Sequence, residues 1–469
     1  MNYDLIIIGA GPGGYHAADY AARNGLSVLI VENSHVGGTC LNVGCIPTKA
    51  LCRNAEVAEL LKDSATYGII HEGLTIDYSA IVRRKDEIVG QLRSGVESIL
   101  SQPGIRLVRG NASLVSPTTI QVEYPDLPNA QTPKRPNDQS PKQPEQFSAS
   151  DIIIATGSEP RMIPIPGIDQ PNVLTSTSLL GISSLPRSLA IVGAGVIGME
   201  MASVFASLGT KVSVIEFLPE CLPMVDAEVA RRLRQTMSRR LSIDFYMQST
   251  VTAIEDNRVK AERKGKTIEI EAEYVLIATG RKPRTEGLHL DILPIEVSKA
   301  GIVTDDYLQT TVPHVYAIGD VNGRSMLAHA ASMQARRAVN HILQRDDNIQ
   351  LSPMPAAVFT HPEAASIGMT EQQGQLEGCL CRKVHYRANG KALADNQTDG
   401  LLKLIVSVDR HIVGCHVCGA HAADIVQMVT ALMHLGATVD QLADITYIHP
   451  TVAEILQEAI MSLKAQTEN

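Results

Sequence analysis

The sequence has no apolar run that approaches the ~18 residues of a membrane-spanning helix, which excludes a transmembrane segment. It also has no excess of basic residues, because 41 lysines and arginines against 50 aspartates and glutamates give a net charge of −9. Nucleic acids bind basic surfaces, so this balance argues against a nucleic-acid partner. The first residues, MNYDLIIIG, contain neither the basic stretch of a secretory signal nor an Arg/Ser-rich presequence. We therefore expect a cytoplasmic protein.

Cysteines are also few, with eight among 469 residues. In a compartment that keeps thiols reduced, structural disulfides are rare, and cysteines at fixed spacing more often bind metal or carry out redox chemistry. Cys40 and Cys45 alone lie in a motif-like sequence, GGTCLNVGCIPTK at 37–49, which we call the cysteine motif. The chain is long enough for about three or four domains.

The start of the chain has the pattern of a dinucleotide-binding unit. An apolar strand at Leu5–Ile8 is followed by the glycine-rich turn GAGPGG at 9–14 and a helical stretch. A second strand at Leu26–Val31 ends in Glu32. In such units the glycines permit a tight turn and close approach to a pyrophosphate, the helix N-terminus faces the phosphates, and the acid accepts hydrogen bonds from a ribose.

The same pattern returns in the middle of the chain. Its parts are a strand at Leu189–Val192, the glycines Gly193, Gly195 and Gly198, a helix, a strand at Lys211–Ile215, and Glu216. The first glycine and the acid are 23 residues apart in both copies, since 32 − 9 and 216 − 193 are equal. Each copy is closed by a similar strand, IIIATGSEPR at 152–161 or VLIATGRKPR at 275–284. One glycine motif is a weak signal, but two matched copies predict two bound dinucleotides.

Glu216 favours NAD over NADP in the second unit. An NADP site replaces this acid and places arginines beside the 2′-phosphate, whereas here no basic residue follows until Arg231. The alternative is that Glu216 merely ends a strand at the surface.

Two further regions differ from the repeated units. Residues 125–144 hold six prolines among polar residues and predict an exposed excursion between strands at Thr118–Tyr124 and Ser150–Ala155. From Pro353 onward the sequence predicts strands at Leu402–Val408 and Ile412–Val417, followed by amphipathic helices. Ile425, Met428, Val429 and Leu432 share one helix face, which is typical of a core or a subunit interface.

The cysteine motif favours redox chemistry. Pro47 suits the start of a helix, which would place Cys45 at a helix N-terminus, where the dipole favours a thiolate. Lys49, one turn later, could add positive charge. The alternatives are two buried thiols or half of a zinc site, but no nearby cysteine or histidine completes four zinc ligands, and we expect no metal.

We expect the remaining cysteines to serve as packing residues. Cys415-His416-Val417-Cys418 is a CxxC sequence, but on an alternating strand its two cysteines point to opposite faces. Metal or redox use is the less favoured alternative, for which His421 offers loose support. We assign packing roles to Cys52, Cys221, Cys379 and Cys381 as well.

Near the C-terminus, His449-Pro450 precedes a helix that carries Glu454. A histidine held in a turn by proline, with a carboxylate in the following helical turn, could be a general base with its orienting partner. From the residues alone, an ordinary turn is the commoner interpretation.

Together these residues resemble the pyridine nucleotide–disulfide oxidoreductases, over nearly the whole chain from Ile6 to about Ala459. The cysteine motif and IHPTVAE at 448–454 are specific to this resemblance, whereas the glycine motifs alone are not. The resemblance implies an α/β fold with two doubly wound domains, one for FAD and one for NAD, a small central domain and an α+β dimerisation domain. The implied boundaries are 1–150 for FAD with the insertion 125–144, 151–281 for NAD, 282–352 for the central domain, and 353–469 for dimerisation.

The resemblance also implies roles for individual residues. The catalytic residues would be Cys40, Cys45, His449 and Glu454, with His449 serving the disulfide of the other subunit. The FAD site would contain Gly9, Gly11, Gly13, Gly14, Glu32, Gly38, Thr39, Lys49, Asn111, Ala112, Thr156, Gly157, Asp320, Met326, Leu327, Ala328 and His329. The NAD site would contain Gly193, Gly195, Val196, Ile197, Gly198, Glu200, Glu216, Gly280 and Arg281.

The branch of the family that this chain resembles most reoxidises protein-bound dihydrolipoamide. The implied partners are a second copy of the chain and a lipoyl-bearing protein, either the E2 component of a 2-oxo acid dehydrogenase complex or the glycine-cleavage H protein. Tyr447, which stands where this branch often has a second histidine, and AASMQA after His329 depart from the pattern and put the substrate in doubt. The alternatives are a reductase of another disulfide, such as glutathione, or a flavin-binding subunit that has lost catalysis. A mercuric or large thioredoxin reductase is disfavoured, because those enzymes use cysteines near the C-terminus, whereas the last cysteine here is Cys418.

Overall fold

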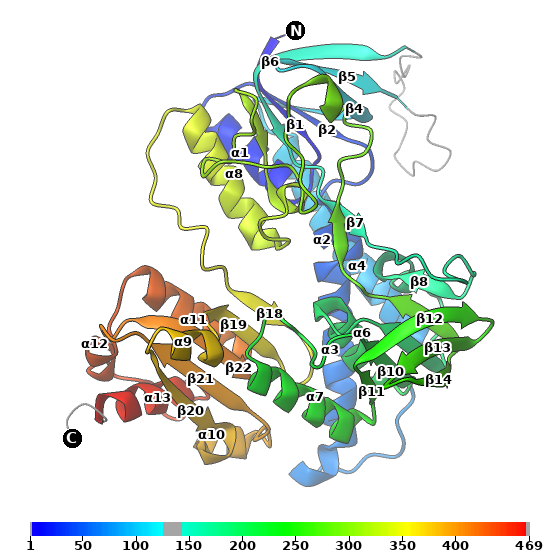
Figure 1. Cartoon of the computed structure of the whole chain (residues 1–469), viewed down its shortest axis with the longest axis vertical. Helices are drawn as coiled ribbons and strands as arrows, with labels where there is room; N and C mark the ends of the chain where they lie inside the picture. Colours follow the sequence, from blue (N-terminus) through cyan, green and yellow to red (C-terminus); the bar gives the residue numbers. More distant parts are fainter. Residues whose placement is uncertain (1, 125–142, 466–469) are drawn as a thin grey trace. The chain divides into compact units, whose positions relative to one another are not determined.

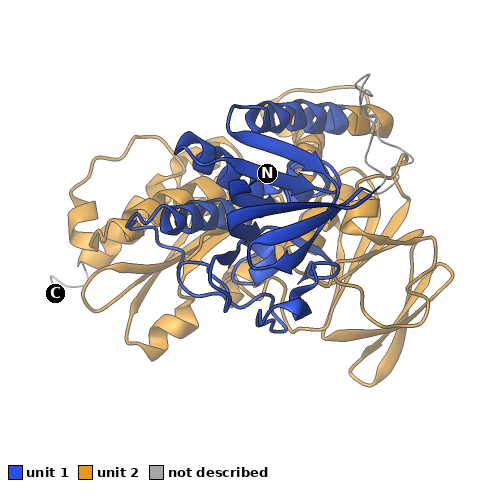
Figure 2. Cartoon of the chain, turned by 90° about the horizontal axis from the view of Figure 1, so that it is seen from above, with its two compact units in different colours: residues 1–47, 84–159, 281–351 blue, residues 48–83, 160–280, 352–469 orange. Residues whose placement is uncertain are grey.

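The computed structural model describes residues 2–124 and 143–465. Most of the predicted proline-rich excursion at 125–144 therefore lies outside the described residues. The described chain forms two compact units, coloured separately in Figure 2. Unit 1 comprises residues 1–47, 84–159 and 281–351, and unit 2 comprises residues 48–83, 160–280 and 352–469. Helices α3 (Cys45–Lys62) and α4 (Tyr78–Leu100) each contribute residues to both units.

Unit 1 is built on a seven-stranded sheet with the order β3-β2-β1-β6-β5-β4, in which β17 also pairs with β6. Strands β1, β2, β3, β6 and β17 run parallel to one another, while β5 is antiparallel to both of its neighbours, β4 and β6. The strands are β1 (Asn2–Ile8), β2 (Val28–Glu32), β3 (Ile105–Arg109), β4 (Asn111–Ser116), β5 (Thr119–Glu123), β6 (Glu145–Ile154) and β17 (Val315–Ala317).

The predicted glycine-rich crossover links β1 and β2, which are neighbours in the sheet of unit 1. Helix α1 (Pro12–Arg23) connects β1 to β2 and packs against α8 (Ala328–Ile342), as Figure 1 shows. Alternate residues of β1 enter two different cores, Leu5 and Ile7 on one face and Ile6 and Ile8 on the other. A parallel strand covered on both faces needs a continuous apolar sequence, which explains the run LIII. The short elements of unit 1 are α2 (Gly38–Val43), η2 (Leu290–Ile292) and η3 (Gly319–Asn322).

Unit 2 contains the second doubly wound sheet, which is entirely parallel and has the order β11-β10-β9-β15-β8. Its strands are β8 (Val173–Thr175), β9 (Ser188–Val192), β10 (Lys211–Glu216), β11 (Asp244–Met247) and β15 (Tyr274–Ile277). Its helices are α5 (Ser176–Leu179), α6 (Val196–Ser207) and α7 (Ala227–Leu241). Strand β9 repeats the pattern of β1, with Leu189 and Ile191 in one core and Ala190 and Val192 in another.

A three-stranded antiparallel sheet accompanies this fold, formed by β12 (Ser249–Glu255), β13 (Arg258–Arg263) and β14 (Lys266–Glu271). A separate two-stranded sheet pairs β7 (Ser158–Pro160) with β16 (Arg281–Pro283). The predicted class of two doubly wound folds is confirmed.

The C-terminal part of unit 2 is an antiparallel sheet of five strands in the order β18-β19-β22-β21-β20. The strands are β18 (Ala356–Val358), β19 (Ala364–Gly368), β20 (Leu380–His385), β21 (Leu401–Val406) and β22 (Ile412–Cys418). The helices are α9 (Glu371–Leu376), α10 (Gly390–Ala394), α11 (Ala422–His434), α12 (Val439–Ala443) and α13 (Glu454–Ala465). The short 3₁₀ turns of unit 2 are η1 (Ser64–Tyr67) and η4 (Tyr386–Ala388).

Two predictions about packing in this region are confirmed. On α11, Ile425 and Val429 are buried in the core, and Met428 and Leu432 pack beside them. The cysteines of the CxxC sequence are fully buried in different cores, Cys415 in one and Cys418 in the other. Burial raises the pKa of each of these two thiols to about 12, which suits packing rather than redox chemistry.

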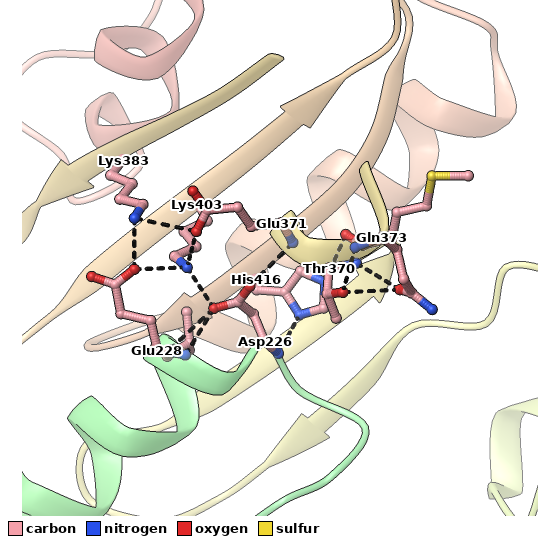
Figure 3. A network of polar contacts seen from close by, with 10 residues as sticks. Asp226, Glu228, Thr370, Glu371, Gln373, Lys383, Lys403 and His416 are labelled. Carbon is pink, nitrogen blue, oxygen red and sulfur yellow. Dashed lines mark hydrogen bonds and ion pairs between the residues drawn. The ribbon is translucent and has the colours of Figure 1, made fainter. Parts of the chain in front are cut away.

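A buried ion-pair cluster joins α7 to the C-terminal sheet (Figure 3). Lys403, on β21, is 1% exposed, and its Nζ lies 2.6 Å from Asp226 Oδ1, 2.6 Å from Glu371 Oε2 and 2.8 Å from Glu228 Oε2. Lys383 Nζ, on β20, contacts the same Glu228 and Glu371 oxygens at 2.8 and 3.2 Å. Because Asp226 also caps the N-terminus of α7, the cluster fixes where that helix begins.

Candidate active site

The first glycine turn has the geometry of a phosphate-binding turn. Gly9 has φ +104°, and a Cβ there would lie 2.5 Å from Ala155 O. A Cβ at Gly14 would lie 1.8 Å from Gly9 O, so both positions require glycine. Gly11, at the N-terminus of α1, is different, since a Cβ there would meet Gly38 Cα at an ordinary 3.8 Å. No side chain caps this helix, which leaves its first amides directed at the space above Gly11.

The second glycine turn repeats this geometry in unit 2. Gly193 has φ +107°, and a Cβ there would lie 2.5 Å from Ala278 O. A Cβ at Gly198 would lie 2.0 Å from Gly193 O, whereas nothing lies within 4 Å of one at Gly195. Helix α6 likewise begins without a side-chain cap. Both turns therefore fit the diphosphate of a dinucleotide.

The two acids hold their turns in the same way. Ala10 N donates to Glu32 Oε2 at 2.7 Å, and Ser34 N donates to Oε1 at 2.8 Å. Ala194 N donates to Glu216 Oε2 at 2.6 Å, and Leu218 N donates to Oε1 at 2.8 Å. Each carboxylate oxygen keeps a second lone pair for a ribose hydroxyl. The spacing from the glycines indicates the two acids but not their hydrogen bonds to the turns.

The cysteine motif packs directly on the first glycine turn. Gly37 N donates to Ala10 O at 2.8 Å, and a Cβ at Gly38 would lie 2.7 Å from Gly11 Cα. Gly38 and Thr39 open α2, which carries Cys40. The motif therefore lies beside the space that a dinucleotide diphosphate would fill.

The backbone folds tightly between the two cysteines of the motif. Gly44 separates α2 from α3, and a Cβ there would lie 2.8 Å from Thr39 O and 3.3 Å from Cys40 Cα. Cys45 is the first residue of α3, as predicted, where the helix dipole favours a thiolate. Both cysteines are half-buried. Their pairing as a redox disulfide stays a prediction.

Lys49, predicted for FAD, and Glu200, predicted for NAD, form one ion pair within unit 2. Lys49 Nζ lies 2.9 and 3.0 Å from the two oxygens of Glu200, which is buried in α6. Phe359 contributes twice, since its N–H donates to Glu200 Oε1 at 2.9 Å and its ring centroid lies 4.8 Å from Lys49 Nζ. Lys49 follows Cys45 by one turn of α3. Nothing in the sequence points to Phe359, which is distant from both residues and belongs to no motif.

Asp320, on η3 of unit 1, belongs to a second polar group. Ser158 Oγ donates to Asp320 Oδ2, and Arg281 donates to Ser158 Oγ and Ser158 O at 2.7 Å each. Arg281 Nε lies 4.0 Å from Asp320 Oδ2. Burial lowers the pKa of Arg281, and the charges of Asp320 and Cys45 act in the opposite direction. Arg281, predicted for NAD, thus lies beside the predicted FAD ligand Asp320.

The other predicted site residues occupy the ends of elements. Thr156 and Gly157 follow β6, and Gly280 precedes β16 with φ +101°. Met326 and Leu327 precede α8, whose first residues are Ala328 and His329. The remaining positions are Asn111 and Ala112 on β4, Gly13 in α1, and Val196 and Ile197 at the start of α6.

His449 and Glu454 form the predicted pair in unit 2. His449 Nδ1 lies 2.8 Å from Glu454 Oε1, and Thr451 N donates to Glu454 Oε2 at 2.8 Å. The hydrogen bonds from Thr451 and then His449 lower the pKa of Glu454. A carboxylate at Nδ1 leaves Nε2 as the nitrogen that can take a proton. The His449 side chain is 79% exposed, so it is presented to the outside of the chain.

Across residues 2–124 and 143–465, no helix combines the length and the apolar character needed to cross a membrane.

Two family profiles cover most of the chain. The profile of the pyridine nucleotide-disulphide oxidoreductases matches residues 3–335, and that of their dimerisation domain matches residues 354–460. The chain therefore belongs to the pyridine nucleotide-disulphide oxidoreductases, enzymes that use FAD and NAD. The C-terminal sheet and its helices are this dimerisation domain.

Individual relatives show which members of the family the chain is similar to. The chain is 36% identical to the dihydrolipoyl dehydrogenase of Chlamydia muridarum (strain MoPn / Nigg), over 98% of this chain and 96% of the relative. It is 35% identical to the dihydrolipoyl dehydrogenase of Bacillus subtilis (strain 168), over 98% of both chains. A solved structure, the Cu(II) complex of the HOCl-induced flavoprotein disulfide reductase RclA from Escherichia coli, superposes with a TM-score of 0.85 at 28% identity. The superposition covers 99% of this chain and 100% of the RclA chain. The predicted family and activity class are confirmed.

Proposed function

We propose that this protein is a dihydrolipoyl dehydrogenase, which oxidises protein-bound dihydrolipoamide to lipoamide and reduces NAD⁺. The observation that carries the proposal is the packing of the cysteine motif on the first glycine turn, where Gly38 meets Gly11 and Cys45 opens α3. This arrangement puts a helix-stabilised thiolate beside a dinucleotide site. Relatives of that name at 35–36% identity over nearly the full chain support the substrate.

The proposed chemistry begins with the histidine. His449, oriented through Nδ1 by Glu454, removes a proton from a substrate thiol with Nε2. The resulting thiolate attacks Cys40 Sγ, the Cys40–Cys45 bond breaks, and Cys45 leaves as a thiolate. The second substrate thiol then attacks the substrate sulfur of the mixed disulfide, which releases lipoamide, and its proton passes to the departing Cys40. FAD, when bound, carries the two electrons from the thiols to NAD⁺.

Other residues of the chain hold charge and position. The dipole of α3 and the Lys49 ammonium stabilise the Cys45 thiolate, and Glu200 with Phe359 fixes Lys49. Glu32 and Glu216 keep the two glycine turns closed and accept from the riboses. The proposed domains are 1–150 for FAD, 151–281 for NAD, 282–352 as the central domain and 353–469 for dimerisation. We further propose a cytoplasmic homodimer that serves a lipoyl-bearing E2 or H protein.

The test is turnover by the purified holoenzyme. We expect a yellow protein that reduces NAD⁺ with dihydrolipoamide. Its KM should be lower for a dihydrolipoylated E2 lipoyl domain or H protein than for free dihydrolipoamide. Cys45→Ser should abolish turnover, while Cys379→Ser, a matched loss of a thiol outside the site, should not. Turnover with NADPH and glutathione disulfide but not with dihydrolipoamide would establish the alternative disulfide reductase. A yellow protein inactive with both would indicate a lapsed subunit.

A further inference from the structure

The loop between β10 and α7 (residues 217–226) is fixed beside the second glycine turn. Ala194, in that turn, donates its N–H to Glu216 at the start of the loop and accepts from Leu222 N at 3.0 Å. Leu218 O accepts from Gln248 N at 3.1 Å, which holds the middle of the loop against the end of β11. The loop therefore borders the position where an adenosine ribose meets Glu216.

Glu220 lies in this loop and binds two arginines of α7. Arg234 forms a bidentate pair, Nε to Oε1 at 2.6 Å and Nη2 to Oε2 at 2.9 Å. Arg231 Nε lies 3.7 Å from Oε2 of the same carboxylate. The Glu220 side chain is 16% exposed, and Cys221 N donates to it at 3.0 Å. A bidentate guanidinium–carboxylate pair of this kind is fixed in geometry as well as in charge.

Each arginine that follows Glu216 as far as residue 234 lies beside a carboxylate. From 217 to 234 the basic residues are Arg231, Arg232 and Arg234. Two of them pair with Glu220, and Arg232 lies 3.5 Å from Asp399. A 2′-phosphate on the ribose needs arginine or lysine as its counter-charge. Arg231 is the first basic residue after Glu216 in the sequence, and the structure adds that it lies beside Glu220.

We propose that Glu220 is a second determinant of nicotinamide specificity, because it withholds Arg231 and Arg234 from the 2′-phosphate of NADP. This inference rests on the proposed NAD site at the second glycine turn. Glu216 selects NAD by binding the ribose, and Glu220 excludes NADP by occupying the guanidinium groups. The ligand class concerned is an adenosine 2′-phosphate.

The test measures equilibrium binding rather than turnover. Dissociation constants of NAD⁺ and NADP⁺ are measured by titration calorimetry on the oxidised holoenzyme. Glu220→Gln should tighten NADP⁺ binding roughly threefold to tenfold, the effect of freeing one or two partly exposed charges, and leave NAD⁺ unchanged. The gain should shrink as salt is added. Glu255→Gln is the matched control, since it removes an exposed carboxylate paired with Lys260 on β12 and β13.

Two further variants separate the possible outcomes. Glu220→Gln with Arg231→Gln and Arg234→Gln should lose the gain, because no guanidinium remains to bind the phosphate. Arg231→Gln with Arg234→Gln in the wild-type background leaves Glu220 unpaired and should weaken NADP⁺ binding further. An equal change for both dinucleotides, a gain reproduced by Glu255→Gln, or a gain that survives loss of both arginines would overturn the proposal. Failure of the wild type to bind NAD⁺ would instead overturn the proposed function.

Discussion

At the residue scale, the acids that end β2 and β10 have two roles in the proposed function. Glu32 and Glu216 each accept an N–H from the glycine turn and another from two residues downstream. These bonds leave the carboxylates oriented before any ligand arrives, which reduces the ordering required on binding. A substitution at either acid therefore changes both the turn and the ribose contact.

Glu216 provides a direct test of the NAD assignment. Glu216→Ala should lower kcat/KM for NAD⁺ about tenfold to a hundredfold, the range for loss of hydrogen bonds to a charged group. The value for NADP⁺ should fall less, because the carboxylate no longer repels the 2′-phosphate. Steady-state kinetics with one thiol donor provide the measurement. Equal wild-type values for the two dinucleotides would contradict the assignment, and so would a variant that discriminates as sharply as the wild type.

Replacing Cys40 and replacing Cys45 should have different effects on the absorbance spectrum, because the two cysteines differ in position. Cys45 opens α3 and lies one turn before Lys49, whereas Cys40 lies within α2. Cys40→Ser should retain a Cys45 thiolate and show a long-wavelength charge-transfer band with the flavin, whereas Cys45→Ser should lack it. Absorbance spectra of the two purified variants provide the comparison. The same spectrum from both would show that the assigned asymmetry is wrong.

At the element scale, the sequence correctly predicts turns, strands and helix starts that are determined by residues close together in the chain. The glycine turns, the strands that end in Glu32 and Glu216, and the start of α3 at Cys45 all follow from local conformational rules. The predicted strand ends differ from the observed ones by a few residues, as at Leu26–Val31 against Val28–Glu32. Boundaries move because hydrogen bonding to neighbouring strands, not local propensity, decides where a strand ends.

Contacts between distant residues could not be predicted in this way. Lys49 and Glu200 are 151 residues apart, and Lys403 and Asp226 are 177 apart. Each is an ordinary charged residue in its own segment, and only the folded chain shows that they are buried together. The pairing of Glu220 with Arg234, only 14 residues apart, was also missed, because it needs the loop and α7 to fold back on each other.

The Lys403 cluster should contribute strongly to stability. Lys403→Met would leave Asp226 buried without its cation, and removal of one partner from a buried pair costs about 3–5 kcal/mol. Lys383→Met is the matched control, because Lys383 and Glu228 are both more than a third exposed and such pairs contribute about 0–1 kcal/mol. Urea unfolding of the two variants measures the difference. A similar loss from both would show that burial of the cluster is unimportant.

His416 should make this region sensitive to mild acid. Its Nδ1 accepts from Asp226 N at 3.1 Å, so Nε2 carries the proton and donates to Met369 O at 2.9 Å. Burial is the main cause that lowers the pKa of His416, with Lys403 acting in the same direction and the Met369 and Gly368 backbones and Asp226 opposing it. The unfolded chain therefore takes up the proton first, and stability should fall as pH drops below about 6.5.

The pH experiment compares thermal midpoints of the wild type and His416→Gln between pH 7.5 and 5.5. Glutamine can supply one acceptor and one donor but does not titrate, so the variant should start lower and lose less as the pH falls. One proton changes the free energy of unfolding by at most about 1.4 kcal/mol per pH unit. Parallel losses in the two proteins would assign the acid sensitivity to other groups.

At the scale of the whole molecule, the turn at residues 448–451, which carries His449, points to an active site completed by a second chain. The dimerisation domain carries His449 with its side chain 79% exposed, and the neighbouring Ile448 is also 79% exposed. A general base must reach its substrate, and an apolar residue beside it gains by being covered. Both needs are met if this turn enters the active site of the other subunit in a symmetric dimer.

Mixed dimers test whether His449 acts on the partner's cysteines. His449→Ala and Cys45→Ser chains, each nearly inactive alone, are unfolded together in equal amounts and refolded with FAD. Random pairing makes half of the dimers mixed, and each mixed dimer has one site with an intact disulfide facing an intact histidine, so activity should recover to about a quarter of wild type. The control mixes Cys40→Ser with Cys45→Ser, which restores no disulfide and should stay inactive. No recovery in the first mixture, despite mixed dimers shown by native mass spectrometry, would place His449 in its own subunit's site. Full activity of an isolated monomer would refute the dimer outright.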